Sequence, residues 1–91
     1  MPNPRHEYRG CSIELCSYEI ESTPESPAGW VPQARIWYDD GGILTSFPLI
    51  SLAVVNIREK ADAVILAQAR ARIDSGNLPR RKRRIRELVT S

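Results

Sequence analysis

The residues best suited to chemistry form a dense run of positive charge near the C-terminus. The basic residues in this run are Arg80, Arg81, Lys82, Arg83, Arg84 and Arg86. Lysine and arginine side chains neutralise phosphate groups and release condensed counterions, so such a run binds a polyanion without reading its sequence. We expect non-specific nucleic-acid affinity here, and the alternative is a solvated tail that binds no specific polyanion.

Charge is divided unevenly along the chain. Residues 80–91 hold six basic side chains and one acidic side chain, which gives this segment a charge of +5. Residues 1–79 hold seven basic and ten acidic side chains, a charge of −3, and the whole chain therefore carries +2. A mildly acidic body with a strongly basic tail is the feature of this sequence that most favours a polyanionic partner.

A tryptophan and an arginine within one expected strand offer a second kind of contact with nucleic acid. Arg35 and Trp37 are two residues apart, so their side chains lie on the same face of a strand. An indole ring can stack on a base, as it does in proteins that bind single strands, and a guanidinium can assist it. The alternative is packing in a core or an interface, which is the commoner role of aromatic residues in strands.

No arrangement of residues in the sequence indicates a catalytic or a metal site. His6 is the single histidine, and one histidine with two distant cysteines does not make a zinc site. Cys11 and Cys16 would lie about 16 Å apart in an extended strand, too far for a disulfide, so we expect two free thiols. The sequence therefore predicts a non-catalytic protein without a cofactor.

Alternating apolar residues predict three strands, at residues 7–20, 30–38 and 43–48 or a little beyond. The alternation changes phase after Cys16, which indicates a bulge at Cys16 or Ser17. The Asp-Gly pair at residues 40 and 41 predicts a tight hairpin between the second and third strands, because glycine adopts positive φ without strain.

One helix is predicted after the strands, with Asn56 as its N-cap and Gly76 at its C-terminal end. Apolar residues recur at every fourth position from Ile57 to Ile73, which supplies a narrow stripe for burial against a sheet. The elements together predict an α+β fold: a three-stranded antiparallel sheet packed against one C-terminal helix and followed by a basic tail.

The domain organisation follows from these elements. Residues 1–6 are expected to form a flexible N-terminus, residues 7–78 a single α+β domain, and residues 79–91 the basic tail, which would become a short helix when bound. A chain of 91 residues buries a small core and is therefore expected to have modest stability. Dimerisation is a common way for such a domain to gain stability. Since no apolar run is long enough for a membrane span and the first residues lack a secretory signal, we expect a cytoplasmic protein without a membrane partner.

Two segments resemble known proteins. Residues 30–38, with the sequence WVPQARIWY, and the alanine-rich helix that ends at residues 73–76 are similar to short bacterial proteins of unknown function with β-β-β-α order. This resemblance covers residues 7–76 and implies a fold but no activity. The same order of elements looks like that of sheet-plus-helix nucleic-acid modules, among them the double-stranded-RNA-binding domain and the integrase-type DNA-binding domain.

These observations lead to two hypotheses from different classes. The first is a non-catalytic binding domain that uses the basic tail for phosphate contacts and Arg35 with Trp37 for bases. The second is a small homodimeric or protein-interaction module of unknown role, whose sheet keeps an apolar outer face for a neighbour to cover.

Overall fold

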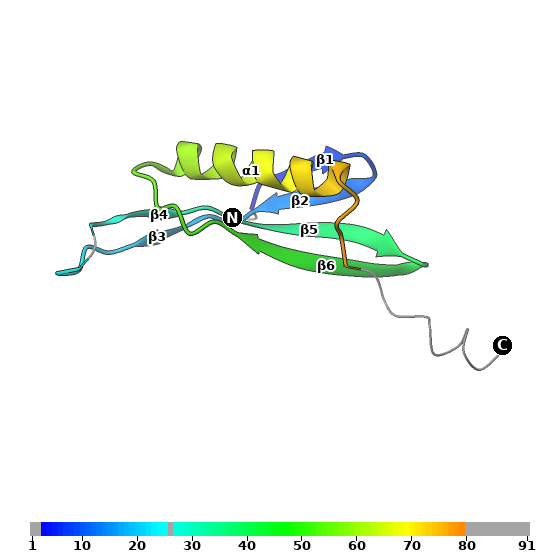
Figure 1. Cartoon of the computed structure of the whole chain (residues 1–91), viewed down its shortest axis with the longest axis horizontal. Coiled ribbons are helices and arrows are strands. Elements are labelled where there is room, and N and C mark those ends of the chain that lie inside the picture. The colour runs from blue at the N-terminus through cyan, green and yellow to red at the C-terminus, as the bar shows by residue number, and fades with distance from the viewer. Residues whose placement is uncertain (1–2, 26, 80–91) are drawn as a thin grey trace.

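The computed structural model describes residues 3–25 and 27–79, which form strands and one helix (Figure 1). The elements in chain order are β1 (Arg5–Tyr8), β2 (Cys11–Leu15), β3 (Tyr18–Ile20), β4 (Gly29–Val31), β5 (Gln33–Asp40), β6 (Ile43–Ile50) and α1 (Arg58–Asp74). The α+β class with a helix after the strands is therefore confirmed. Within the basic tail, Pro79 is described, whereas the cations from Arg80 onward lie outside the described residues.

The main sheet has four antiparallel strands in the order β1-β2-β5-β6, and a separate ribbon pairs β3 with β4. The predicted number of three strands is thus wrong. The expected strand at residues 7–20 begins instead with a hairpin, because Arg9 and Gly10 both have positive φ (51° and 80°) and reverse the chain. β1 also includes Arg5 and His6, which the sequence analysis placed in a flexible N-terminus.

A proline separates the main sheet from the ribbon. The expected strand at residues 30–38 is divided at Pro32, which has no N–H to donate to a ladder. On the facing segment, Cys16 and Ser17 separate β2 from β3. Leu15 lies opposite Ala34 and Tyr18 opposite Val31, so neither segment has an extra residue and the predicted bulge is not formed. The Cys16 N–H donates to the Gln33 carbonyl (2.8 Å), and the Gln33 N–H donates to the Ser17 hydroxyl (3.3 Å). These bonds hold the two segments of the chain together where they leave the main sheet.

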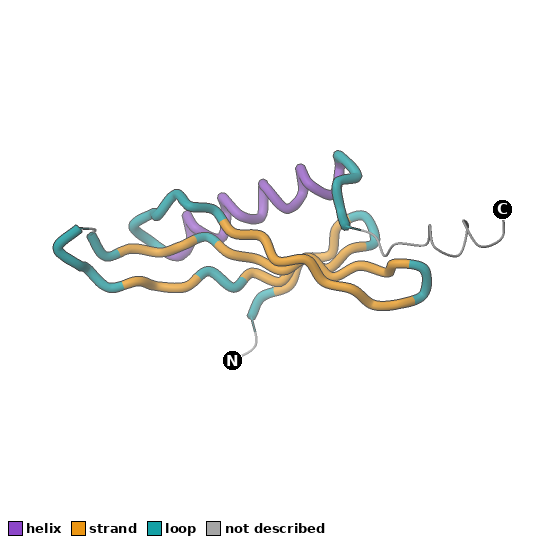
Figure 2. The backbone as a smooth tube through the Cα atoms, turned by 60° about the horizontal axis from the view of Figure 1, so that its bottom comes forward, coloured by secondary structure: helices purple, strands orange, loops and turns teal. Residues whose placement is uncertain are grey.

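The core lies between the main sheet and α1, which covers one face of the strands (Figure 2). Alternate residues of β2 and β5 point toward the helix, and α1 contributes part of the predicted stripe. The buried residues of this cluster are Cys11, Ile13, Leu15, Ala34, Ile36, Tyr38, Ile65 and Ala69. The alanines let the helix approach the sheet closely, so a narrow stripe is enough to close the core.

The ends of α1 differ in how closely they follow the prediction. The helix begins at Arg58, and Ile57 takes the N-cap position without a side-chain hydrogen bond, so the predicted Asn56 cap is not formed. At the other end Gly76 has a φ of 74° and its N–H donates to the Ile73 carbonyl (3.1 Å), as expected for a glycine that ends a helix. In the described residues, no helix has the length and apolar character that crossing a bilayer requires.

Candidate functional site

The candidate site is the face of the main sheet that α1 leaves uncovered, here called the open face. The register places Arg5, Glu14 and Arg35 in one row across β1, β2 and β5, with Pro48 of β6 beside them. The next row contains Glu7, Ser12, Trp37 and Ser46. Strand alternation sends these side chains away from the helix, and thus the fold itself brings Arg35 and Trp37 together on one face as predicted.

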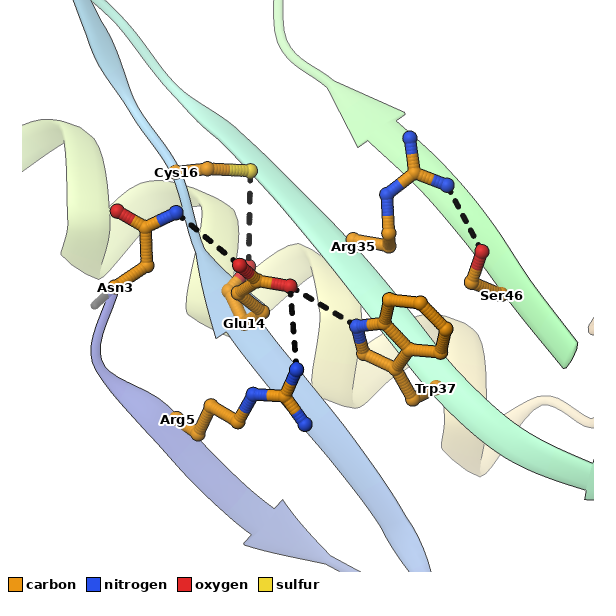
Figure 3. A network of polar contacts seen from close by, with 7 residues as sticks. All are labelled: Asn3, Arg5, Glu14, Cys16, Arg35, Trp37 and Ser46. Carbon is orange, nitrogen blue, oxygen red and sulfur yellow. Dashed lines mark hydrogen bonds and ion pairs between the residues drawn. The ribbon is translucent and has the colours of Figure 1, made fainter. Parts of the chain in front are cut away.

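Glu14 is the centre of a polar network on the open face (Figure 3). One carboxylate oxygen accepts a hydrogen bond from Trp37 Nε1 (3.0 Å) and lies 3.7 Å from Arg5 Nη2, and the other accepts from Asn3 Nδ2 (3.1 Å). The Arg5 guanidinium also lies over the Trp37 ring, 5.6 Å from its centroid. The indole therefore has its polar edge bonded and one face covered by groups of the same chain.

Arg35 is also bonded within the domain. Its Nη1 donates to the Ser46 hydroxyl across the β5–β6 pair, at 2.9 Å. The open face carries carboxylates at Glu7 and Glu14 beside its arginines, so it is not a concentrated positive surface. Stacking of bases on Trp37 and Arg35 stays a prediction. A base that stacks on the indole face beneath Arg5 would have to displace that guanidinium.

Arginine side chains elsewhere in the domain also contact groups of the same chain. Arg9 pairs with Asp74 (2.8 Å), and Arg58 pairs with Asp62 (3.7 Å) while lying over the Trp30 ring. Two further arginines lie over aromatic rings, Arg70 over Tyr8 and Arg72 over Phe47. Every arginine in the described residues thus contacts a carboxylate, a hydroxyl or an aromatic ring of the same chain.

The cluster that joins the first turn to the end of the helix could not be found from the sequence. The Tyr8 hydroxyl donates to the Asp74 carboxylate (2.8 and 2.9 Å), to which Arg9 is also paired. The residues involved are 66 positions apart, and neither the periodicity nor the composition links them. The cluster closes the sheet against the helix at one end. A side-chain hydrogen bond with Tyr8, followed by the charge of Asp74, raises the pKa of Arg9.

The structure fixes the point from which the basic tail begins. Leu78 packs against the core cluster, and the Pro79 carbonyl accepts a hydrogen bond from the Tyr38 hydroxyl. The predicted phosphate-binding residues follow immediately and lie outside the described residues: Arg80, Arg81, Lys82, Arg83, Arg84 and Arg86. The end of the described chain is therefore held against β5 rather than extending freely from the helix.

Neither cysteine forms a disulfide, as predicted. Cys11 is buried in the core, and Cys16 is half-buried beside Glu14. Burial raises the pKa of Cys16, and the nearby Glu14 carboxylate raises it further. A thiol with a raised pKa is a poor nucleophile at neutral pH. Among residues 3–25 and 27–79, no three metal-binding side chains gather into a group that could hold an ion.

Comparison of the chain with protein-family models, curated proteins and solved structures finds no match. The resemblance to short bacterial proteins therefore stays a prediction, and we infer function from the geometry and the charge of this chain.

The Glu14 network makes stability depend on pH. The pKa of the Glu14 carboxylate is lowered from the ordinary 4.5, first by the hydrogen bond from Trp37 and then by the hydrogen bond from Asn3. A lowered pKa in the folded state stabilises the fold above pH 4.5, and this contribution is lost as the pH falls through the folded-state value. We expect Glu14→Gln to flatten the acid side of the stability curve, measured by urea unfolding at several pH values.

The control for this measurement is Glu25→Gln, which removes a carboxylate from the exposed loop between β3 and β4. Its pH dependence is expected to follow that of the parent chain. Equal flattening by both variants would mean that Glu14 is not a principal source of the acid sensitivity.

Proposed function

We propose that this chain is a non-catalytic binding domain with non-specific nucleic-acid affinity through its basic tail. The charge division carries the proposal: +5 on residues 80–91 against −3 on residues 1–79. Phosphate contacts made by such a run supply affinity that depends steeply on salt and weakly on sequence.

The arginines of the domain already contact carboxylates, a hydroxyl or aromatic rings of the same chain, and this supports the assignment of phosphate contacts to the tail. A cation that already pairs with a carboxylate or lies on an aromatic ring gains less from a phosphate, since it must leave its present partner. Arg5 with Glu14, Arg9 with Asp74 and Arg58 with Asp62 are examples. The run at residues 80–86 has one acidic neighbour in the tail, Glu87.

The attachment of Pro79 to Tyr38 supports a definite origin for the tail. With Leu78 packed on the core and the Pro79 carbonyl bonded, the first cation follows directly from a fixed point on the domain. The cationic segment then attracts phosphates, and like-charge repulsion keeps bound phosphates away from the mildly acidic body.

The test is a salt titration of binding to random duplex and single-stranded oligonucleotides. Six phosphate contacts predict a slope of about −5 in log K against log salt for duplex, and of about −4 for a single strand. Between 50 and 200 mM salt, duplex affinity is expected to fall roughly a thousandfold. Absence of binding at 50 mM salt would overturn the proposal.

Two single substitutions distinguish phosphate contacts made by the tail from phosphate contacts made by the open face, since each removes one guanidinium. Arg83→Gln is expected to reduce the salt slope by about one, whereas Arg35→Gln is expected to leave it unchanged. A reduced slope with Arg35→Gln would move a phosphate contact to the open face. Trp37→Phe addresses stacking, because lost single-strand affinity at an unchanged slope would assign a base contact to that ring.

A second function, self-association or docking of a protein, is favoured by a different observation. Apolar side chains are exposed along β6 and the connection to α1: Ile43, Leu44, Ile50, Leu52, Val54 and Ile57. Among them, Leu44 is 71% exposed and Leu52 is 91% exposed. Exposed apolar side chains that gather along one strand and the following connection of a small domain favour a site that a partner covers.

A further inference from the structure

β6 is an open edge of the main sheet in the described part of the chain. The strand order places β1 at one edge and β6 at the other. β1 is short and carries Arg5 and Glu7, features that discourage pairing with another strand. β6 extends over eight residues, Ile43–Ile50, and contains no charged side chain. Of the two edges, β6 is therefore the one prepared to accept a further strand.

The register shows which backbone groups of β6 point outward. The two-residue turn makes Asp40 and Ile43 a hydrogen-bonded closing pair, after which bonded and non-bonded pairs alternate along the ladder. Just past β6, the Ser51 N–H donates to the Pro32 carbonyl (3.0 Å), so this odd-numbered residue fits the same alternation of bonded and non-bonded residues. Odd-numbered residues of β6 thus bond β5, whereas the even-numbered residues direct their backbone groups to the outer edge.

This phase explains why β6 continues through a proline. Pro48 is an even-numbered residue opposite Arg35, so its missing N–H lies on the outer side and costs the β5–β6 ladder nothing. β6 accordingly continues to Ile50, a little beyond Pro48. At the outer edge, Leu44, Ser46 and Ile50 retain N–H groups that a new strand can use.

The side chains along this edge have a pattern that is complementary to itself. Leu44 and Ile50 lie near opposite ends of β6 on the open face, 71% and 49% exposed. Antiparallel pairing of two identical strands brings the beginning of one against the end of the other. An uncharged strand can pair in this way without placing like charges opposite each other.

We propose that β6 pairs with β6 of a second copy of this chain, in the antiparallel register that places Leu44 opposite Ile50. Each Leu44–Ile50 pair exchanges two N–H···O=C bonds, and each Ser46–Pro48 pair makes one, because proline lacks the second donor. Phe47 of each copy then faces its own counterpart on the helix side. The two exposed apolar side chains of each copy are covered at the same time.

The competing registers satisfy fewer groups. Placing Pro48 opposite Pro48 brings together two residues that lack N–H donors at the centre of the ladder. Placing Ser46 opposite Ser46 leaves Leu44 opposite Pro48 and moves Ile50 to the turn glycine Gly42. The chosen register pairs the two large apolar residues, and it joins the two sheets into one with both helices on the same face.

The first test is the association state, measured by sedimentation over a range of concentrations. The full chain is expected to form dimers. Ser46→Pro removes an outward N–H without removing a backbone bond to β5. Ser46→Ala loses the same hydroxyl, which accepts from Arg35, but keeps the N–H. We expect Ser46→Pro to weaken the dimer at least roughly tenfold, whereas Ser46→Ala stays close to the parent chain.

The second test reads the register directly and does not depend on Ser46→Pro folding. Leu44→Cys and Ile50→Cys chains are prepared separately and mixed under mild oxidation. A disulfide that forms in the mixture, and not within either single variant alone, is the expected result, since Leu44 of one copy lies opposite Ile50 of the other. A chain that remains monomeric at all concentrations, or dimers unaffected by Ser46→Pro and not linked in the mixture, would overturn the proposal.

Discussion

Replacing Ile36 with alanine is expected to lower the free energy of unfolding by about 3 kcal/mol. Ile36 is fully buried on the central strand β5, where it lies between Ile13 and Phe47 of the neighbouring strands. Truncation removes buried methyl and methylene groups and leaves a cavity beneath α1, which cannot collapse without moving the strands. The loss is comparable to the whole stability of a domain this small.

Urea unfolding at a fixed protein concentration measures this change, since association would otherwise alter the apparent stability. Leu52→Ala is the matched control. It also shortens a branched aliphatic side chain, but Leu52 is 91% exposed, so its effect should stay within about 0.5 kcal/mol. Similar losses for the two variants would be inconsistent with a core between β5 and α1.

The second large effect is expected at Gly29, where alanine should cost about 2 kcal/mol. A Cβ atom added to Gly29 would lie 2.5 Å from Val54 Cγ1 and 2.8 Å from the Val55 carbonyl oxygen. The segment around Val55 is held there by two backbone hydrogen bonds with Trp30, at 2.6 and 2.9 Å. The extra methyl group therefore forces apart the connection to α1 and the β3–β4 ribbon.

A double variant divides this cost between its two causes. Val54→Ala removes the nearer clash and, because Val54 is exposed, should cost little alone. Combined with Gly29→Ala it is expected to restore part of the lost stability, since the clash with the Val55 backbone remains. Full recovery would show that the Val55 carbonyl moves freely. No recovery would assign the whole cost to that carbonyl.

Local sequence signals were sufficient for the elements whose partners lie nearby in the chain. The turn at Gly41 and Gly42, with φ values of 65° and 90°, joins β5 to β6 as the Asp-Gly signal predicts. The stripe that includes Ala61, Ile65 and Ala69 is buried as its spacing requires. Short charged strands carry little of this signal, and so the sequence does not predict β1 as a strand separate from β2.

The candidate site was less accessible to prediction, because its contacts depend on strand register. Alternation places Arg35 and Trp37 on one face, but it does not reveal that Glu14 of β2 faces them or that Arg5 covers the indole. Those neighbours follow from the order β1-β2-β5-β6, which composition does not determine. The attachment of Pro79 to Tyr38 joins residues 41 positions apart and has no local signal.

The division of the chain at Pro32 gives each sheet its own fluorophore. Trp30 lies in the β3–β4 ribbon, Trp37 lies in the main sheet, and the chain contains no other tryptophan. Single Trp→Phe variants therefore report on either unit alone by emission spectra. Coincident transitions would describe one cooperative unit, and an earlier change at Trp30 would identify the ribbon as a segment that opens locally while the main sheet remains intact.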